Sequence, residues 1–294
     1  MPTPTLVVIQ SGPFSTLQDL GRRGRGHQGV ARSGAFDQRS HRLANRLVGN
    51  DVTSASLEIL FGPCELAATD HVVVAVTGTH AQVTITSSDG ATRHEGVNSA
   101  FLLRAGQRLL VGVPSEGLRT YLSVRGGFDV PPVLGSRSFD SLGLIGPSPL
   151  KLDATLTIGT HIVDEAWFET VPLRQTAEDS LVDLRLGPRH DWLSDEALAT
   201  IADMRWTIDA ASNRTGVRFA GPKLFRRDDE LASEAMIPGA VQLPLSGLPI
   251  VLGPDGGTTG GYPVIGVVPQ SGLDHLAQRR PGDRVGFRVL PAGR

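Results

Sequence analysis

Short apolar runs separated by turn-forming residues are the feature that most restricts the fold of this chain. Its 294 residues include 35 glycines and 20 prolines, and both residue types favour tight turns. The longest aliphatic run is VVVAV at 72–76, whereas a helix that crosses a bilayer needs about 20 apolar residues. We therefore expect no membrane span and predict many short strands joined by turns.

The predicted strands form one dense group in each half of the chain. Helices are few, and we expect them at 37–48, at 195–203 with Ser194 as the N-cap, and near 273–278 before Pro281. This pattern predicts a mainly β fold with a few short helices. The strand candidates are 6–10, 57–61, 72–77, 81–86, 100–103, 108–113 and 120–124, followed by 182–186, 206–209, 217–219, 250–252, 264–268 and 284–289.

Weak self-similarity between the two halves predicts two copies of one β-barrel module. VVIQSGP at 7–13 parallels VDLRLGP at 182–188, and AGQRLLVG at 105–112 parallels PGDRVGFR at 281–288 with nearly the same offset. We expect an N-terminal domain at 1–173 and a C-terminal domain at 181–294. The polar stretch at 174–180 is the predicted linker.

Composition and spacing argue against several classes of function. A formal net charge of -2 disfavours a general nucleic-acid-binding surface, so we expect no polyanion partner. Gly24, Gly26 and Gly29 satisfy GxGxxG, but the strand before and the helix after that a dinucleotide site requires are not evident. The eight histidines show no HExxH spacing and there is no CxxC, so no dedicated metal site is expected.

Cys64 is the single cysteine, and it follows a Gly-Pro turn without a nearby cation to stabilise a thiolate. We expect a buried structural thiol. One cysteine cannot form an intramolecular disulfide, which favours a reducing, cytoplasmic setting. The N-terminal stretch MPTPTLVVIQSG lacks the positive leader and the long apolar run of a signal peptide.

The stretch 33–63 holds most of the candidate chemistry. Asp37 is placed to cap a helix that Gly49 ends, and it either only caps or also faces substrate. Asparagine is mildly unfavourable inside a helix, so Asn45 on the polar face is either solvated or turned toward a cleft. Glu58 lies inside the apolar run LEILF, where a buried carboxylate requires a partner.

Two arginines are candidates for binding a carboxylate. Arg125 ends the strand YLSV and precedes two glycines, so its guanidinium can reach past bare backbone into a cleft. The alternative is an internal ion pair with Glu58 or Asp129. Arg214, in SNRTG, has the same two interpretations, a clamp for a ligand or a structural ion pair.

The stretch GGTTGGYP at 256–263 combines four glycines with three hydroxyl side chains, those of Thr258, Thr259 and Tyr262. Glycines let backbone N–H groups approach a ligand closely, which suits a carboxylate, carbamate or phosphate. A hairpin turn is the alternative. The side chains of the expected loop at 16–23 that can join the same pocket as Asp37 and Asn45 are Gln18, Asp19 and Arg23.

Several long blocks occur in the order found in one known family. SGAFD, ANRLVGN and LEILFGP lie within 33–63, YLSVRGGFDVPPVLGSRS spans 121–138, SNRTGVRFAGP spans 212–222, and TTGGYPVIGVV spans 258–268. In these blocks the chain resembles the allophanate hydrolase subunit 2 family, also called the Kip-antagonist family or the family of the C component of 5-oxoprolinase. The resemblance covers nearly the whole chain and implies two cyclophilin-like β-barrel domains.

The resemblance also implies one subunit of a hetero-oligomeric enzyme. Such a complex is of the ATP-dependent amidohydrolase type or of the biotin-dependent carboxyltransferase type. It acts on a small amide, lactam or urea compound. The B component of the complex, which is similar to the Kip inhibitor and to allophanate hydrolase subunit 1, would be the partner. We identify no biotin-attachment motif AMKM and no ATP-grasp signature, so ATP or carboxybiotin would act through partner subunits.

One branch of the family antagonises a kinase inhibitor, so a non-catalytic regulatory binding module is the alternative function. For the enzyme, family position and residue chemistry together select a set of candidate site residues. The catalytic candidates are Asp37, Glu58 and Arg125, and the substrate-binding candidates are Gln18, Arg23, Asn45, Arg214, Thr258, Thr259 and Tyr262.

Overall fold

The computed structural model describes residues 3–172, 181–227 and 229–290, which form two compact units. Unit 1 comprises Met1–Arg22, Asp37–Phe139 and Leu144–Arg174, and unit 2 comprises Arg23–Phe36, Asp140–Gly143 and Gln175–Arg294. Two short segments from the N-terminal half therefore belong to unit 2, whereas the boundaries expected from sequence assign them to the first domain. The predicted linker at 174–180 lies outside the described residues.

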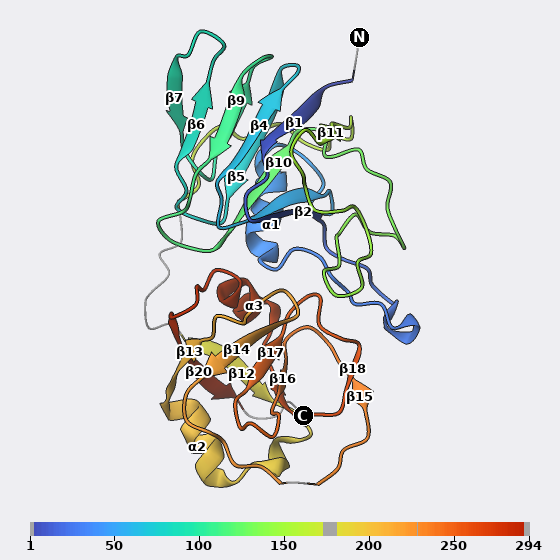
Figure 1. Cartoon of the computed structure of the whole chain (residues 1–294), viewed down its shortest axis with the longest axis vertical. Coiled ribbons are helices and arrows are strands. Elements are labelled where there is room, and N and C mark those ends of the chain that lie inside the picture. Colours follow the sequence, from blue (N-terminus) through green and yellow to red (C-terminus); the bar gives the residue numbers. More distant parts are fainter. Residues whose placement is uncertain (1–2, 173–180, 228, 291–294) are drawn as a thin grey trace. The chain divides into compact units, whose positions relative to one another are not determined.

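Unit 1 contains two antiparallel sheets (Figure 1). The six-stranded sheet has the order β11-β1-β4-β9-β6-β7, and the five-stranded sheet has the order β2-β3-β10-β5-β8. The first sheet consists of β1 (Thr5–Gln10), β4 (Cys64–Ala68), β6 (Val83–Thr86), β7 (Thr92–Glu95), β9 (Arg108–Val111) and β11 (Thr155–Thr157). The second consists of β2 (Phe14–Gln18), β3 (Ser56–Leu60), β5 (Val72–Thr77), β8 (Ala100–Leu103) and β10 (Arg119–Val124).

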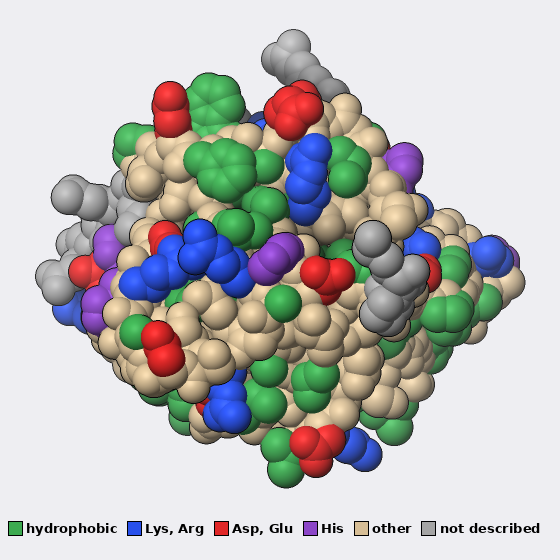
Figure 2. Space-filling view, turned by 90° about the horizontal axis from the view of Figure 1, so that it is seen from above, with side chains coloured by type: hydrophobic (Ala, Val, Ile, Leu, Met, Phe, Trp, Pro, Cys, Tyr) green, Lys and Arg blue, Asp and Glu red, His purple; other side chains and the backbone are tan. Residues whose placement is uncertain are grey.

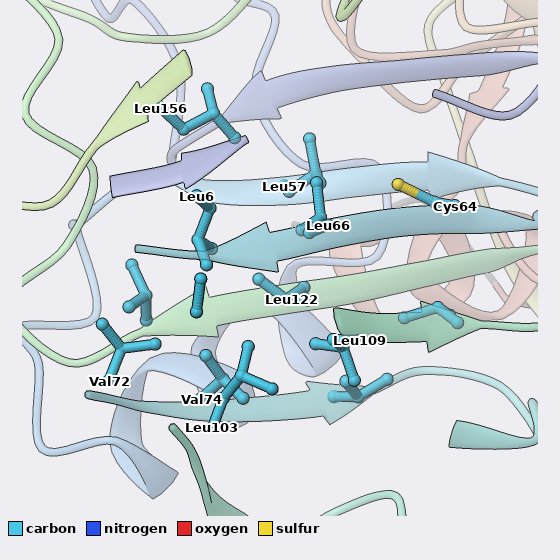
Figure 3. Close-up of a cluster of buried hydrophobic side chains, with 14 of the residues drawn as sticks. Leu6, Leu57, Cys64, Leu66, Val72, Val74, Leu103, Leu109, Leu122 and Leu156 are labelled. Atoms are coloured by element: carbon cyan, nitrogen blue, oxygen red, sulfur yellow. The ribbon is translucent and has the colours of Figure 1, made fainter. Parts of the chain in front are cut away.

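The core of unit 1 lies between these two sheets (Figure 3). Leu6, Leu66 and Leu109 come from the six-stranded sheet, and Leu57 and Leu122 come from the five-stranded sheet. Side chains alternate between the two faces of a strand, so a strand such as β4 gives every second residue, Cys64, Leu66 and Ala68, to this core. Cys64 is fully buried in it, and burial raises the pKa of its thiol to about 12, which confirms the expected structural thiol.

Helix α1 (Gln38–Leu47) packs against β10, β5 and β3, on the five-stranded sheet of unit 1. Asp37 caps its N-terminus by accepting a 2.9 Å hydrogen bond from the Ser40 N–H, which confirms the predicted cap. Gly49 follows the helix with a φ of 73°, a conformation that favours glycine. Leu47 and Val48 form a small apolar cluster with Ala75 of β5.

Unit 2 contains a closed barrel with the strand order β12-β19-β16-β17-β14-β13-β20 (Figure 1). β12 and β20 run parallel, and the other barrel neighbours pair antiparallel. The barrel strands are β12 (Leu181–Leu186), β13 (Arg205–Ile208), β14 (Gly216–Ala220), β16 (Ala240–Gln242), β17 (Ile250–Leu252), β19 (Val264–Val267) and β20 (Arg284–Leu290). The remaining elements are α2 (Asp195–Asp203), α3 (Gln270–Leu276), the short pair β15 (Glu234–Ala235) and β18 (Thr259–Gly260), and the 3-10 turns η1 (Gly26–Gln28) and η2 (His190–Trp192).

Aromatic side chains fill much of the core of unit 2. Trp206 is fully buried, and Phe219 and Phe287 meet edge to face with 5.4 Å between ring centroids. Phe36, from the segment Arg23–Phe36, is part of the same core. This segment therefore belongs to unit 2 through apolar packing as well as through the polar contacts described below.

The predicted mainly β class with a few short helices is confirmed, and most predicted strands are observed within one or two residues. Helix α2 has the predicted bounds and the predicted Ser194 cap. Helix α3 begins three residues earlier than expected, directly after Pro269. The expected loop at 16–23 is wrong at its start, because Phe14–Gln18 form β2 and pair with β3.

Among the described residues, no helix combines the length and the apolar character needed to cross a membrane. On the face that Figure 2 shows, basic and acidic side chains are interspersed rather than grouped by sign.

Candidate functional site

Buried polar side chains cover the face of the five-stranded sheet that lies toward α1. Thr16 and Tyr121 each lie opposite Glu58, and Gln18 lies opposite Ser56. Directly opposed residues of antiparallel strands share a face, so these side chains point the same way. We call this group, with His41 of α1, the polar layer; its members are Thr16, Gln18, His41, Ser56, Glu58, Arg119 and Tyr121.

Glu58 is at the centre of the polar layer. Its Oε2 accepts a 2.7 Å hydrogen bond from the Tyr121 hydroxyl, and its Oε1 lies 3.6 Å from Nε of Arg119. The Tyr121 hydroxyl in turn accepts a 2.8 Å hydrogen bond from the backbone N–H of Asp37. The predicted requirement for a partner is therefore met twice, by a phenol and by a guanidinium, neither of which was predicted.

Tyr121 stays protonated at neutral pH. Complete burial raises its pKa well above the ordinary value, and the negative charges of Glu58 and Asp37 raise it further. A protonated phenol has one O–H group and so donates one hydrogen bond, and here it donates that hydrogen bond to Glu58. This geometry keeps one oxygen of the Glu58 carboxylate in a fixed position.

His41 is neutral and joins α1 to β3. Its Nε2 lies 3.1 Å from the carbonyl oxygen of Val52, so Nε2 carries the proton, and Nδ1 accepts a 2.7 Å hydrogen bond from the Ser56 hydroxyl. Burial lowers the pKa of His41 to about 4. At neutral pH this histidine therefore does not carry charge into the layer.

Gln18 is fully buried, and its side-chain amide donates 2.9 Å hydrogen bonds to the hydroxyl of Thr16 and to the carbonyl of Phe139. Its Oε1 has no hydrogen-bond partner among the described residues. A buried acceptor without a partner is costly and unusual in a native structure. Among the described residues, the side-chain oxygen of Gln18, a predicted substrate-binding residue, is therefore a buried acceptor without a hydrogen bond.

Asn45 is held by hydrogen bonds within unit 1. It is fully buried, its amide donates a 2.8 Å hydrogen bond to the carbonyl of Ser54, and its Oδ1 accepts one of 3.2 Å from Asn50. Asn50 also bonds the carbonyl of Val124. These contacts fix the turn after α1; a substrate-binding role for Asn45 stays a prediction.

Arg125 bridges backbone segments of unit 1. Its Nη1 donates 2.9 Å hydrogen bonds to the carbonyls of Val48 and Asp164, and its Nη2 lies 3.7 Å from the exposed carboxylate of Glu165. The ion pair that Arg125 forms is with Glu165, so the expected pair with Glu58 or Asp129 is wrong. Carboxylate clamping and catalysis by Arg125 stay predictions.

Arg214 forms a bidentate ion pair with Asp255 in unit 2. Its Nε and Nη2 lie 2.8 and 2.9 Å from the two carboxylate oxygens, and Nη2 also donates to the carbonyl of Gly34. Asp255 further accepts hydrogen bonds from Ser33 and Ser141. Burial acts to raise the pKa of Asp255, but Arg214 and these hydrogen bonds hold it below its ordinary value.

The Arg214–Asp255 pair therefore fastens the segments Arg23–Phe36 and Asp140–Gly143 to unit 2. The structural ion pair expected for Arg214 is observed, and a ligand-binding role for Arg214 stays a prediction. Asp255 was not predicted, because the sequence GPDGG is typical of a turn. No local sequence pattern indicates that a residue 41 positions away is the ion-pair partner of Arg214.

The other predicted binding residues of unit 2 are more exposed. Arg23 is exposed, Thr258 is half-buried, and Thr259 and Tyr262 are exposed. Thr259 lies in β18, which pairs with β15, and the Thr258 carbonyl accepts a hydrogen bond from Met236. Part of GGTTGGYP is thus a strand, and a ligand-binding role for its hydroxyls stays a prediction.

The predicted site residues thus fall into two groups. Gln18, Asp37, Asn45, Glu58 and Arg125 belong to unit 1, and Arg23, Arg214, Thr258, Thr259 and Tyr262 belong to unit 2. Within unit 1, the structure brings together Asp37 and Glu58 through Tyr121. Across the described residues, no group of three or more His, Cys, Asp or Glu side chains is placed to hold a metal ion.

Comparison with known proteins gives consistent matches over nearly the whole chain. Residues 28–289 match the carboxyltransferase domain, subdomain A and B. The C component of 5-oxoprolinase from Escherichia coli is 35% identical over 286 residues, which cover 96% of this chain and 90% of that protein. The urea amidolyase of Saccharomyces cerevisiae is 29% identical over 98% of this chain, but the match covers 17% of that much longer protein.

A solved structure has the same fold. The crystal structure of the K. lactis urea amidolyase matches 99% of this chain with a TM-score of 0.91 and 30% sequence identity. The matched part is 19% of that chain. The similarity therefore extends from sequence to three-dimensional structure.

Proposed function

Because the chain belongs to the carboxyltransferase domain family, subdomain A and B, we propose that it is one part of a hetero-oligomeric, ATP-dependent complex that acts on a small amide, lactam or urea compound. The observation that carries this proposal is the match to 90% of the C component of E. coli 5-oxoprolinase at 35% identity. The chain spans less than a fifth of the urea amidolyase, so the reaction of that whole protein is a weaker guide. A 5-oxoprolinase-type reaction is the first choice.

The relatives from E. coli and Haemophilus influenzae are each named as one component of a 5-oxoprolinase, which supports a hetero-oligomer. The proposed partner is a B component that is similar to the Kip inhibitor and to allophanate hydrolase subunit 1. ATP, or carboxybiotin for a urea-carboxylase type of reaction, would act through the partner subunits. This chain alone is proposed to bind neither.

Within the proposed reaction, Glu58 is the candidate that moves a proton. Its carboxylate is held by the Tyr121 hydroxyl on one oxygen, and its charge is offset by Arg119 near the other. Opening an amide or a lactam requires proton transfer to nitrogen and stabilisation of the charge that develops on the carbonyl oxygen. Tyr121, oriented by the Asp37 N–H, would keep Glu58 in position during the transfer.

Reconstitution tests this function. The purified chain is assayed for ATP-dependent release of glutamate from 5-oxoproline, alone, with its partner subunits, and with each component left out in turn. We expect turnover in the full mixture and loss of turnover when this chain is omitted. Turnover that persists without this chain, or none in a complex whose assembly is verified by size, would overturn the assignment.

A further inference from the structure

A polar pocket of about 600 Å³ lies in unit 1, within the size range of small-molecule sites. Residues of three segments line it, at 51–55, 126–129 and 158–161, together with Thr3 and Arg137. Two of these parts, GGFD at 126–129 and Arg137, lie within the block YLSVRGGFDVPPVLGSRS that the family resemblance selected. Neither the polar layer nor the proposed reaction accounts for them.

Glycines let the backbone segments of this pocket meet without side chains. Gly126 and Gly127 have φ values of 94° and 74°, which favour glycine. A Cβ atom at Gly126 would overlap the carbonyl oxygen of Gly159, and one at Gly159 would come within 2.7 Å of the Gly126 carbonyl oxygen. The Gly126 N–H is fixed by a 2.9 Å hydrogen bond to Asn50.

Arg137 is held in place by its backbone and by one nitrogen of its side chain. Its backbone N–H donates a 2.6 Å hydrogen bond to Asp19, and its Nε donates one of 2.6 Å to the carbonyl of Val130. Asp19 is itself fixed by the hydroxyls of Ser136 and Ser138. Among the described residues, the two terminal nitrogens of Arg137 have no hydrogen-bond or ion-pair partner.

The two acidic side chains of the pocket differ in whether their carboxylates already accept hydrogen bonds from the protein. Asp51 accepts hydrogen bonds of 2.7 and 2.6 Å from the backbone N–H and the hydroxyl of Thr53. Asp129 is exposed and makes no ion pair or side-chain hydrogen bond with any described residue. Arg137 and Asp129 thus line one pocket with opposite charges and do not pair with each other.

We propose that this pocket binds a small molecule that carries both a carboxylate and an N–H group. The carboxylate binds the terminal nitrogens of Arg137, which suit bidentate contact, and the N–H group binds the carboxylate of Asp129. An α-amino acid and the lactam of such an acid share this chemistry. A phosphate dianion fits less well, because Asp51 and Asp129 would repel its two charges more strongly than the single charge of a carboxylate, and because it offers no N–H group to Asp129.

Binding is measured by isothermal titration calorimetry on the purified chain. The probes are 5-oxo-L-proline and L-glutamate, with propionate as the probe that lacks the N–H group and urea as the probe that lacks the carboxylate. We expect at least one of the first two to bind about tenfold or more tightly than either control probe. Binding of the lactam alone or of the amino acid alone identifies which source the pocket prefers, and either result supports the proposal.

Matched variants localise the binding. Arg137→Gln and Asp129→Asn are each expected to weaken binding about tenfold or more, while Arg104→Gln and Asp153→Asn, at exposed positions of the same unit, leave it unchanged. Thermal melting checks that all four variants fold as the wild type does. Absence of binding by both 5-oxo-L-proline and L-glutamate, or equal binding by Arg137→Gln and the wild type, would overturn the proposal.

The choice of 5-oxo-L-proline as a probe rests on the proposed function, but the two claims fail separately. Turnover by the reconstituted complex without binding to this pocket leaves the function standing and removes the pocket assignment. Binding that depends on Arg137 and Asp129, without any turnover, leaves the pocket assignment standing and removes the proposed function.

Discussion

Burial sets the protonation of the two rings in the polar layer. Tyr121 is kept as a neutral donor by a raised pKa, and His41 is kept as a neutral ring by a pKa lowered to about 4. Their ring centroids lie 6.4 Å apart in an edge-on arrangement. At neutral pH the charge of this layer therefore rests on Glu58 and Arg119.

The depressed pKa of His41 makes the folded chain sensitive to acid. Between pH 6.5 and about 4 the unfolded chain binds a proton at His41 that the folded chain does not, so stability falls as pH falls through this window. The loss amounts to about 3 kcal/mol once both states are protonated. We expect His41→Gln to reduce the pH dependence of the free energy of unfolding in urea between pH 7.5 and 4.5.

His27→Gln, at an exposed position, is the matched control substitution. An identical pH dependence in His41→Gln and the wild type would contradict this role for His41.

For single residues, the sequence predicts which residue types form the site better than it predicts their hydrogen-bond and ion-pair partners. The apolar run around Glu58 shows that a buried carboxylate needs a partner, and Asp37 is recognisable as a cap from local pattern alone. That the partner is Tyr121 follows from the register in which Tyr121 lies opposite Glu58. Register between strands that are distant in sequence is set by tertiary packing, so it could not be predicted here.

Helix α1 tests whether Asp37 has more than a capping role. Asp37→Ala removes the acceptor for the Ser40 N–H and should cost about 1 kcal/mol of stability, whereas Asp37→Ser keeps a capping side chain and should cost about 0.5 kcal/mol or less. Urea unfolding measures both values. Equal losses in the two variants would contradict the capping account.

Turnover of the same two variants in the complex addresses the predicted catalytic role. If Asp37 takes part in the reaction, Asp37→Ser lowers turnover although it keeps the stability. Full turnover by Asp37→Ser would remove Asp37 from the catalytic set.

In unit 2, the buried Arg214–Asp255 pair fastens two chain segments to the barrel. Asp255→Asn leaves a buried guanidinium without its counter-charge and should cost about 3–5 kcal/mol of stability. Asp183→Asn disrupts the more exposed pair of Asp183 with Arg288 and should cost about 1 kcal/mol or less. Comparable losses for the two variants in urea unfolding would contradict the role assigned to Asp255.

Elements with strong local patterns were predictable, and elements fixed by their neighbours were not. The aliphatic run of β5 and the Ser194 cap of α2 were found with the observed bounds. In contrast, β2 (FSTLQ) and β4 (CELAA) mix polar and small residues, and they are strands because they pair with neighbours. The start of α3 was missed because QSG, directly after Pro269, reads as a turn.

For the whole molecule, several long sequence blocks in a fixed order predicted the family and the mainly β class. Sequence-based domain boundaries are continuous ranges, and they cannot express that Arg23–Phe36 belongs to unit 2. That assignment depends on contacts between residues far apart in the chain, such as Phe36 with the barrel core and Gly34 with Arg214. Such contacts leave no local pattern.

Glu58 is the residue through which we propose that this chain contributes chemistry to an amide-processing complex. The most direct test is the kcat for 5-oxoproline of the assembled complex that carries Glu58→Gln, with Glu65→Gln of β4 as the matched control. We expect the Glu58 variant to assemble and to lose about 10²–10⁴-fold in kcat, while the control retains turnover. Wild-type turnover by an assembled complex with Glu58→Gln would contradict the claim.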